Sequence, residues 1–321
     1  MTRQLTVVSP IYNEVGNLRR LHEAVREALV DFEWELLLVN DGSTDGSTQL
    51  LDEMVAEDER VRVIHFVRNY GQTAALKAGF KNATHDLIVT MDGDMQNDPA
   101  DIPALVEKLD EGWDVVTGWR KDRQDTFITR TLPSRIANKL ISKLSNVHLH
   151  DYGCTLRVYK SEYVRDVPLY GEMHRFLPIY VTWAGARLVE VPVNHFPRVS
   201  GESKYGLSRI PKVLLDLTTL KFLRDYYVTP IYFFGAFGVM LLLAGLGLGL
   251  VAALAWAAGW SSAVAVTLTV IAPMLALFGM VEITLGVIAE VMIRMHYDIR
   301  DKEPYRIRRV VGGAGGSTEG E

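Results

Sequence analysis

The chain has 321 residues with a net charge of -5, and 48% of them are hydrophobic. This mild negative charge gives no reason to expect a nucleic-acid partner, and a single cysteine, Cys154, excludes an intrachain disulfide framework and a multi-cysteine zinc site. The length allows one large domain with an appendage.

The first 205 residues alternate short apolar runs with amphipathic segments. The runs predict strands at residues 5–10, 34–41, 61–67, 86–92 and 113–118, and the segments at 17–32 and 47–58 have helical periodicity. This rhythm predicts an α/β fold with a mostly parallel sheet covered by helices on both faces. Ligands of such sheets bind beyond the carboxyl ends of the strands.

Residues 91–98, MDGDMQND, follow one predicted strand directly and contain three carboxylates. Burying an unpaired carboxylate is costly, so such a cluster needs a cation, a basic partner or open water. Asp92 and Asp94 converge on one cation if the chain bends at Gly93, and Gln96 adds an amide oxygen. Mg²⁺ or Mn²⁺ prefers these oxygen ligands and often shares its shell with substrate phosphates. A solvated acidic loop is the alternative.

The C-terminal third contains a long uncharged stretch. Residues 226–281 include no Asp, Glu, Lys, Arg or His, which predicts membrane spans rather than a soluble core helix. The sequence GWSS at 259–262 divides the stretch into spans 230–258 and 263–288. Basic residues flank both outer ends, whereas the connecting loop is uncharged, so the positive-inside rule places both chain ends in the cytoplasm. The N-terminal residues lack signal-peptide features, which agrees with this topology.

Seven motifs together resemble the family 2 glycosyltransferases, and more narrowly the polyprenyl-phosphate glycosyltransferases, the group that includes dolichyl-phosphate mannose synthase and bacterial lipid-phosphate glucosyltransferases. They are SPIYNE (9–14), VNDGSTDGS (39–47), MDGDMQNDP (91–99), GWR (118–120), DYGC (151–154), GEMHRFLP (171–178) and HFPRVSGESKYG (195–206). The resemblance runs through the domain in order and continues through the paired C-terminal spans.

This resemblance implies a GT-A nucleotide-diphospho-sugar transferase fold and a donor site. The residues implied to bind the nucleotide are Pro10, Tyr12, Glu14, Asp41 and Asp92, and those implied to hold the metal are Asp92, Asp94 and Gln96. For Tyr12, core packing is the alternative. Asp45 and Asp98 are interpreted as turn or helix-capping residues rather than ligands.

The resemblance also implies a site for the phosphate of a lipid acceptor. Its residues would be Arg120, Arg130, Ser134, Arg198 and Lys204. Arginine suits bidentate phosphate contacts, although each of these cations alone fits a solvated surface charge as well. Asp151 resembles the proposed catalytic aspartate of the family, either as a base or as an orienting group. Cys154 is interpreted as a core residue rather than a nucleophile.

These patterns divide the chain into four parts. They are a cytosolic GT-A catalytic domain (1–205), an amphipathic juxtamembrane segment (206–228), a two-helix transmembrane hairpin (229–293) and a basic cytosolic tail with a disordered end (294–321). The juxtamembrane segment is expected to form an interfacial helix, with an ordinary surface helix as the alternative. For Glu282 and Glu290 in the second span, we favour helix packing or snorkelling over transport.

We therefore expect a metal-dependent, inverting transferase in the cytoplasmic membrane. UDP-glucose is the favoured donor and undecaprenyl phosphate the favoured acceptor, and the paired spans leave room for a homo-oligomer. The enzymatic alternatives are a GDP-mannose-dependent dolichyl-phosphate mannose synthase and an aminoarabinose-type transferase. A noncatalytic membrane scaffold is a further alternative, and a processive polysaccharide synthase is disfavoured because the chain has no QxxRW motif.

Overall fold

The computed structural model describes residues 3–121, 132–167, 169, 171, 173–197, 222, 225–226, 229–259 and 263–300, with only the backbone for 132–137 and 294–300. The chain forms two compact units, Met1–Leu217 and Thr218–Glu321. Each unit is described below by itself.

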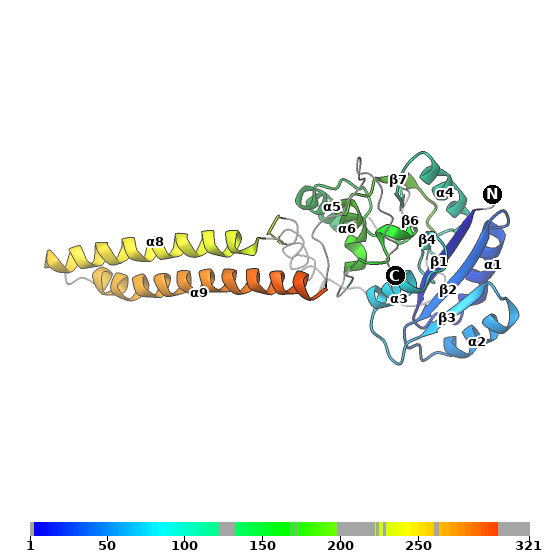
Figure 1. Ribbon diagram of the computed structural model, residues 1–321, viewed down its shortest axis with the longest axis horizontal. Coiled ribbons are helices and arrows are strands. Elements are labelled where there is room, and N and C mark those ends of the chain that lie inside the picture. The colour runs from blue at the N-terminus through cyan, green and yellow to red at the C-terminus, as the bar shows by residue number, and fades with distance from the viewer. Residues whose placement is uncertain are drawn as a thin grey trace, which may run out of the picture. The chain divides into compact units, whose positions relative to one another are not determined.

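The first unit is built on a seven-stranded sheet with the strand order β3-β2-β1-β4-β6-β5-β7 (Figure 1). The strands are β1 (Gln4–Ile11), β2 (Glu33–Asn40), β3 (Val61–His65), β4 (Leu87–Thr90), β5 (Val115–Trp119), β6 (Arg157–Lys160) and β7 (Leu188–Pro192). Strands β1 to β5 are the five that the sequence predicts. The pairs β1–β2, β1–β4, β2–β3 and β5–β7 are parallel, which confirms the mostly parallel sheet.

Two strands lie outside the sequence prediction. Strand β6 runs antiparallel between β4 and β5, and β7 forms the edge beside β5. Strand β6 has only four residues and begins with Arg157, so it lacks the apolar run that marks the other central strands. Its charged first residue is nevertheless buried, because it pairs with backbone carbonyls from two other segments.

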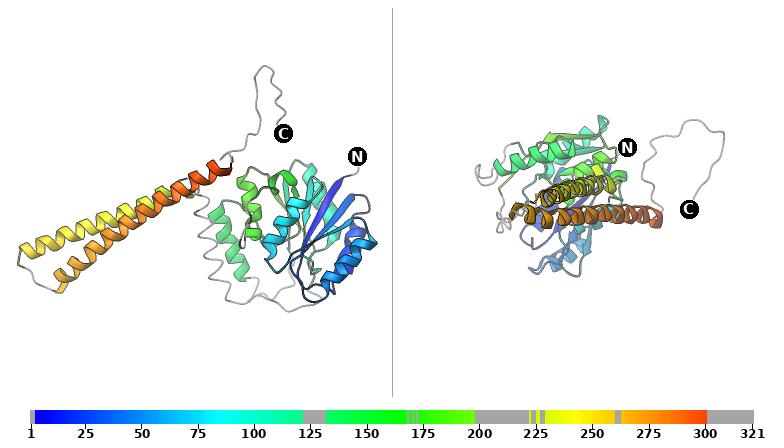
Figure 2. Two further views of the ribbon diagram at one scale, coloured as in Figure 1. Left: turned by 60° about the horizontal axis from the view of Figure 1, so that its bottom comes forward. Right: turned by 90° about the vertical axis from the view of Figure 1, so that its left-hand side faces the viewer.

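Helices cover both faces of the sheet (Figure 2). They are α1 (Leu18–Ala28), α2 (Ser47–Glu57), α3 (Gln72–Asn82), α4 (Ile102–Asp110), α5 (Leu132–Ser145) and α6 (Leu177–Trp183), with short 3-10 turns η1 (Pro99–Asp101), η3 (Ser161–Tyr163) and η4 (Met173–Phe176). Apolar residues of α1, α2 and α4 form one buried cluster with the sheet, and those of α3 and α6 form another. Alternate strand residues point to opposite faces, so the sheet contributes to both clusters.

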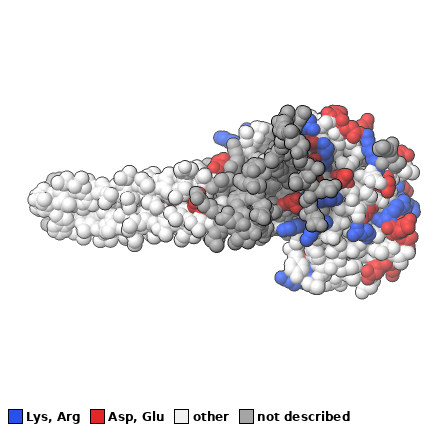
Figure 3. Space-filling view, in the orientation of Figure 1, with Lys and Arg blue, Asp and Glu red and all other residues white. Residues whose placement is uncertain are grey.

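The second unit contains α8 (Pro230–Ala257) and α9 (Ala263–Arg300), each long and apolar enough to cross a membrane. The two helices pack closely through glycines. A Cβ at Gly238 would lie 2.7 Å from the Gly279 carbonyl oxygen, and one at Gly245 would lie 2.7 Å from the Ala272 carbonyl oxygen. Over most of the hairpin the visible surface carries no Lys, Arg, Asp or Glu (Figure 3). Small residues at the contact and apolar residues outside are typical of membrane helix pairs.

Replacing Gly279 by leucine is expected to force α8 and α9 apart, because a Cβ at this position would lie 2.6 Å from the Gly238 carbonyl oxygen. Overpacking of this kind costs about 1–3 kcal/mol. Spin labels at exposed Leu250 and Val270 should then give a longer and broader distance distribution than in the parent protein. Gly247→Leu is the matched control, since a Cβ at Gly247 meets nothing within 4 Å. An unchanged distribution in the Gly279 variant would contradict this packing.

Candidate functional site

The polar motifs meet at one edge of the sheet. Strands β1, β2 and β4 are parallel, so their carboxyl ends lie at the same edge. Strand β1 lies between β2 and β4: the chain passes from β1 to β2 on one side, and it returns from β3 to β4 on the other side of β1. Ligands of α/β sheets bind at such a switch point. Asp41 follows β2 and Asp92 follows β4, which places both of them there.

We call residues 91–98 the acidic loop. Its turn is tight: Asp94 is buried, the Gln96 N–H donates to the Asp94 carboxylate at 3.2 Å, and Met95 between them has a positive φ of 60°. A Cβ at Gly93 would lie 2.6 Å from Cδ1 of Ile11, so a larger residue here would require the Ile11 side chain to move. The geometry therefore places Gly93, between the two acidic residues, beside the SPIYNE motif.

Two other segments of the chain contact Gln96 and Asn97 in the acidic loop. The Asn97 amide donates to the Thr155 hydroxyl at 2.8 Å, directly after the DYGC motif. Asn97 also forms an isolated bridge with His195, and the Phe196 N–H donates to the Gln96 carbonyl at 2.9 Å. The beginning of the HFPRVSGESKYG motif thus lies against the acidic loop.

The acidic loop brings carboxylates close together, and this affects the pKa of Asp92. Burial raises the pKa of Asp92 to about 6, and the neighbouring Asp94 carboxylate adds to the rise. A hydrogen bond with Thr155 and the positive charges of Arg120 and Arg157 oppose it. These charges offset part of the negative charge at the loop.

Arg120 and Asp151 form a bidentate ion pair in which Asp151 is buried and Arg120 is partly buried. Arg120 Nε donates to Asp151 Oδ2 at 2.7 Å, and Nη2 donates to Oδ1 at 3.0 Å. Burial disfavours the charged guanidinium, but the hydrogen bonds and charge of Asp151 outweigh this effect and raise the pKa of Arg120. The Gly153 N–H also donates to Asp151, and a Cβ at Gly153 would lie 2.8 Å from Arg120 Nη2. The glycine of DYGC therefore makes room for the guanidinium.

Asp41 is held by the backbone that precedes α3. It is 3% exposed, and its carboxylate accepts the N–H groups of Tyr70 at 2.6 Å and Gly71 at 2.9 Å. The adjoining Gly42 has a φ of +69°, and a Cβ there would lie 2.5 Å from the Arg68 carbonyl carbon. The glycine in NDG is thus required by a close backbone approach.

The loops after β1 and β2 are joined by side-chain bonds. Asp45 accepts the N–H groups of Val15 and Ser47, and Asp98 accepts the Ala100 N–H at the start of η1. Both aspartates are therefore turn or capping residues, as the sequence predicts.

Cys154 is fully buried in the core, and burial raises the pKa of its thiol to about 11. It is a core residue, which also confirms the prediction.

The geometry tests none of the roles predicted for the site residues. Pro10 lies near the acidic loop, since its carbonyl oxygen is 3.6 Å from the position of a Cβ at Gly93. Tyr12 and Glu14 follow the end of β1 at the same edge of the sheet. Arg130, Arg198 and Lys204 lie outside the described residues. Ser134 lies in the first part of α5, residues 132–137, for which only the backbone is described.

The sequence prediction missed three polar residues that bond to the site or add charge near it. The Gln72 amide donates to Asp92 Oδ1 at 2.7 Å, Thr155 supports the acidic loop, and buried Arg157 adds a positive charge near it. Gln72 follows β3 at the same edge of the sheet as Asp41 and Asp92. The rule that ligands bind beyond the carboxyl ends of strands points to this edge of the sheet but does not single out Gln72.

The residues of the acidic loop fit a divalent cation. Even without Asp98 of the same loop, the carboxylates of Asp92, Asp94 and Asp151 outnumber the guanidinium groups of Arg120 and Arg157 among the described residues, so negative charge remains in excess. Within the described part of the chain no cluster of three or more His, Cys, Asp or Glu side chains is arranged to hold a metal. Two carboxylates and an amide leave several positions of an octahedral ion to other oxygens, such as those of a diphosphate.

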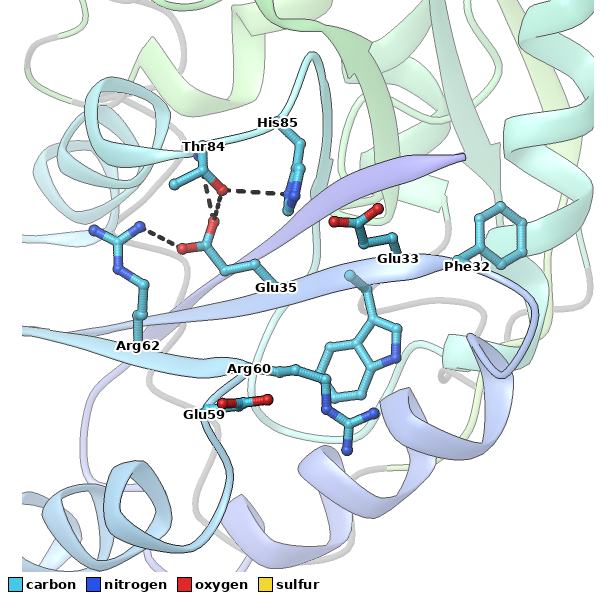
Figure 4. A pocket seen from close by; sticks show the side chains of 9 residues that line it. Phe32, Glu33, Glu35, Glu59, Arg60, Arg62, Thr84 and His85 are labelled. Atoms are coloured by element: carbon cyan, nitrogen blue, oxygen red, sulfur yellow. Dashed lines mark hydrogen bonds and ion pairs between the residues drawn. The ribbon is translucent and has the colours of Figure 1, made fainter. Parts of the chain in front are cut away.

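A separate hollow of about 470 Å³ lies at the opposite edge of the sheet (Figure 4). It is lined by the first residues of β2 and by Arg60, Arg62, Thr84 and His85. Its buried acid, Glu35, accepts hydrogen bonds from the hydroxyls of Thr6 and Thr84, both at 2.8 Å, and pairs with Arg62. These groups bond to one another, so we interpret the cluster as structural.

Glu35→Gln is expected to lower the free energy of unfolding by about 1–3 kcal/mol near neutral pH, because a buried charged acceptor loses its charge. Burial acts to raise the pKa of Glu35, but the bonds from Thr6, Thr84 and Arg62 outweigh it, so the pKa in the folded protein is lowered. This stabilisation is present above the unfolded pKa of about 4.3 and is lost as the pH falls through the folded value.

The check is thermal unfolding of both proteins in detergent from about pH 7 to about pH 3.5. The difference in midpoint should shrink as the pH falls. A difference that is constant or grows toward acid would show that the Glu35 charge does not stabilise the fold.

The mixed sheet with an acidic loop at its switch point defines a GT-A nucleotide-diphospho-sugar transferase fold. The model of the glycosyl transferase family 2 matches residues 6–167. The chain is 39% identical over 320 residues to a dodecaprenyl-phosphate galacturonate synthase of Rhizobium johnstonii, with 96% of this chain and 93% of that protein covered. It is 36% identical over 315 residues to an undecaprenyl-phosphate 4-deoxy-4-formamido-L-arabinose transferase of Klebsiella pneumoniae, with 96% and 94% covered.

Among solved structures, the chain is similar to glucosyl-3-phosphoglycerate synthase of Mycobacterium tuberculosis, crystallised with Mn²⁺, uridine diphosphate and glucosyl-3-phosphoglycerate. The TM-score is 0.53 at 19% sequence identity, and the match covers 71% of this chain and 83% of that one. This likeness concerns the fold alone. From the family model and the two relatives, the chain belongs to glycosyl transferase family 2 and is a glycosyltransferase.

Proposed function

We propose that this protein transfers a sugar from a nucleoside diphosphate sugar to a polyprenyl phosphate at a membrane surface. The observation that carries the proposal is the acidic loop, which brings Asp92 and Asp94 to the switch point beside Asp41. The names of the two relatives, both of them polyprenyl-phosphate sugar transferases, support the acceptor class, and their similarity spans almost the whole chain.

The donor is assigned to the carboxyl edge of the sheet. Pro10, Tyr12 and Glu14 would contact the nucleotide, and Asp41, fixed by two backbone N–H groups, would accept a hydrogen bond from the base. The relatives' names contain galacturonate and formamido-arabinose, so these sugars join the donors to be tested, and the aminoarabinose-type alternative gains weight. UDP-glucose, favoured from the sequence, stays a prediction.

Asp92, Asp94 and Gln96 would hold Mg²⁺ or Mn²⁺. When bound, such a cation offsets the negative charge of the donor diphosphate and of the leaving nucleoside diphosphate. Arg120 would add positive charge near the loop, because its charge acts on Asp92. Excess negative charge in the described site is the observation that supports this assignment.

The acceptor chemistry needs no strong base. A phosphate monoester is already ionised near neutral pH and attacks the anomeric carbon directly, while the bond to the nucleoside diphosphate breaks. One such displacement inverts the anomeric centre. Both oxygens of Asp151 accept hydrogen bonds from Arg120, which supports an orienting role for this carboxylate.

The lipid phosphate is assigned to Arg120, Arg130, Ser134, Arg198 and Lys204. The described beginning of the HFPRVSGESKYG motif supports the assignment of this motif: the Phe196 N–H donates to the Gln96 carbonyl of the acidic loop. We further propose that the α8–α9 hairpin lies in the cytoplasmic membrane with both chain ends in the cytosol. The basic residues outside both spans and the uncharged connection between them support this orientation.

Arg198→Ala and Arg130→Ala should each weaken use of the lipid phosphate by about ten- to a hundredfold, because each loses a charge-assisted contact. Affinity for the nucleoside diphosphate should stay nearly unchanged. Initial rates against polyprenyl phosphate test the first statement, and calorimetric titration with nucleoside diphosphate and Mg²⁺ tests the second. If a folded variant loses nucleotide binding while its dependence on acceptor is unchanged, these arginines belong to the donor site.

The proposed function is tested by a donor screen. Purified protein in detergent is given polyprenyl phosphate, Mn²⁺ and one radiolabelled nucleotide sugar at a time, including UDP-glucose, UDP-galacturonate, GDP-mannose and a formamido-arabinose donor. At least one donor should label the lipid fraction. Transfer to water or to a soluble acceptor alone would contradict the assignment of the acceptor.

A further inference from the structure

Four successive residues at the start of α3, Tyr70 to Thr73, bond to three different parts of the site. The N–H groups of Tyr70 and Gly71 donate to Asp41, and the Gln72 side-chain amide donates to Asp92 Oδ1 at 2.7 Å. The Thr73 hydroxyl shares a hydrogen bond of 2.7 Å with His174 Nδ1. We call residues 70–73 the YGQT segment.

We propose that Gln72 is a positioning residue for the metal site and fixes the orientation of the Asp92 carboxylate. This inference rests on the proposed function, in which Asp92 holds a divalent cation. A side-chain amide donates a hydrogen bond without adding charge, so it restrains the carboxylate without neutralising it. Partners behind the ligands of a metal commonly act in this way, and their loss typically weakens metal binding by about 10- to 100-fold.

The position of Gln72 is itself fixed from two sides. Gly71 has a φ of +92°, a conformation that favours glycine, and this turn presents the two N–H groups to Asp41. On the other side, Thr73 and His174 are both buried, and the His174 carbonyl accepts a bond from Arg157 Nη1 at 3.3 Å. A single turn of backbone thus joins Asp41, Asp92 and the GEMHRFLP motif.

Helix α3 is also docked closely on the sheet. A Cβ at Gly79 would lie 2.2 Å from Cγ1 of Val8, so the helix approaches β1 at a distance that only glycine permits. Leu76 and Phe80 lie in the buried cluster of the same face. Because the helix is held along its length, its first residue has little freedom to move away from Asp92, and Gln72 can act as a rigid support.

The test measures Mn²⁺ binding to the purified full-length protein in detergent by electron paramagnetic resonance, with no sugar or lipid present. Gln72→Met keeps the length of the side chain but removes the donor, and we expect it to weaken Mn²⁺ binding by about 10- to 100-fold. Lys77→Met is the matched control on the exposed face of α3 and should bind as the parent does. In transfer assays the apparent KM for Mn²⁺ should rise, while kcat at saturating Mn²⁺ changes little.

Equal or tighter Mn²⁺ binding by a folded Gln72→Met protein would overturn the inference. Gln72→Asn is the second variant, since its amide is one methylene too short to reach Asp92, and it should weaken binding in the same way. If the parent protein binds no Mn²⁺, the metal assignment of the proposed function fails together with this inference. If the parent binds Mn²⁺ and the Gln72 variants bind it equally tightly, this inference alone fails.

Discussion

Asp94→Asn is expected to lower sugar transfer by at least about a hundredfold, because it removes a charged metal ligand while keeping the shape of the side chain. Asp94 is buried within the acidic loop, and the Gln96 N–H still finds an oxygen in the variant, so the fold should persist. Initial rates of transfer at saturating donor and acceptor measure the effect. EDTA should reproduce the loss in the parent protein, and added Mn²⁺ or Mg²⁺ should reverse it.

Asp98→Asn is the matched control for this prediction. Asp98 belongs to the same acidic loop, but its carboxylate caps η1 by accepting the Ala100 N–H, and asparagine caps equally well. Its transfer rate should therefore stay close to that of the parent. Full activity of the parent protein in EDTA, or of Asp94→Asn without added metal, would show that the acidic loop does not act through a cation.

Asp151→Asn should reduce kcat by about a hundredfold or more, because Arg120 loses the carboxylate that holds it and that raises its pKa. Breaking a buried ion pair also costs about 3–5 kcal/mol of stability. The pH profile of kcat separates the two roles that the sequence left open. If Asp151 orients Arg120, the residual activity keeps the parental profile, whereas loss of the acidic limb in the variant would identify a general base.

Asp114→Asn is the control for the stability effect. Asp114 precedes β5 and pairs with Arg187 and Lys160, while Arg120 follows the same strand at its other end. The control therefore removes a comparable carboxylate far from the acidic loop. It should lower the unfolding temperature yet leave kcat near the parental value at low temperature. Equal losses of activity in both variants would attribute the effect of Asp151 to destabilisation.

The sequence predicted the parts of the fold that have strong local patterns. Strands β1 to β5 have apolar runs, and the carboxylates of the acidic loop follow β4 directly, so their place at the sheet edge could be inferred from the order of residues alone. Strands β6 and β7 could not be inferred in this way. Strand β6 has four residues, starts with a buried arginine and reverses direction, and β7 is a partly exposed edge strand.

The sequence singled out residues of the candidate site, but it did not indicate which of them contact one another. Arg120 and Asp151 were both singled out, but they lie 31 positions apart, and no local pattern indicates that they form a bidentate pair. Gln72 was missed because the polar residues after β3 look like an ordinary turn. Its contact with Asp92 depends on how α3 docks on the sheet, which is a tertiary feature.

The most direct test of the proposed reaction measures both products together. Purified protein is incubated with polyprenyl phosphate, Mn²⁺ and the donor found in the screen, and the lipid-linked sugar and the released nucleotide are quantified. The proposed displacement yields one nucleoside diphosphate for each sugar recovered on the lipid phosphate, with the anomeric configuration inverted. Release of nucleoside monophosphate instead, or no sugar in the lipid fraction with any donor, would contradict it.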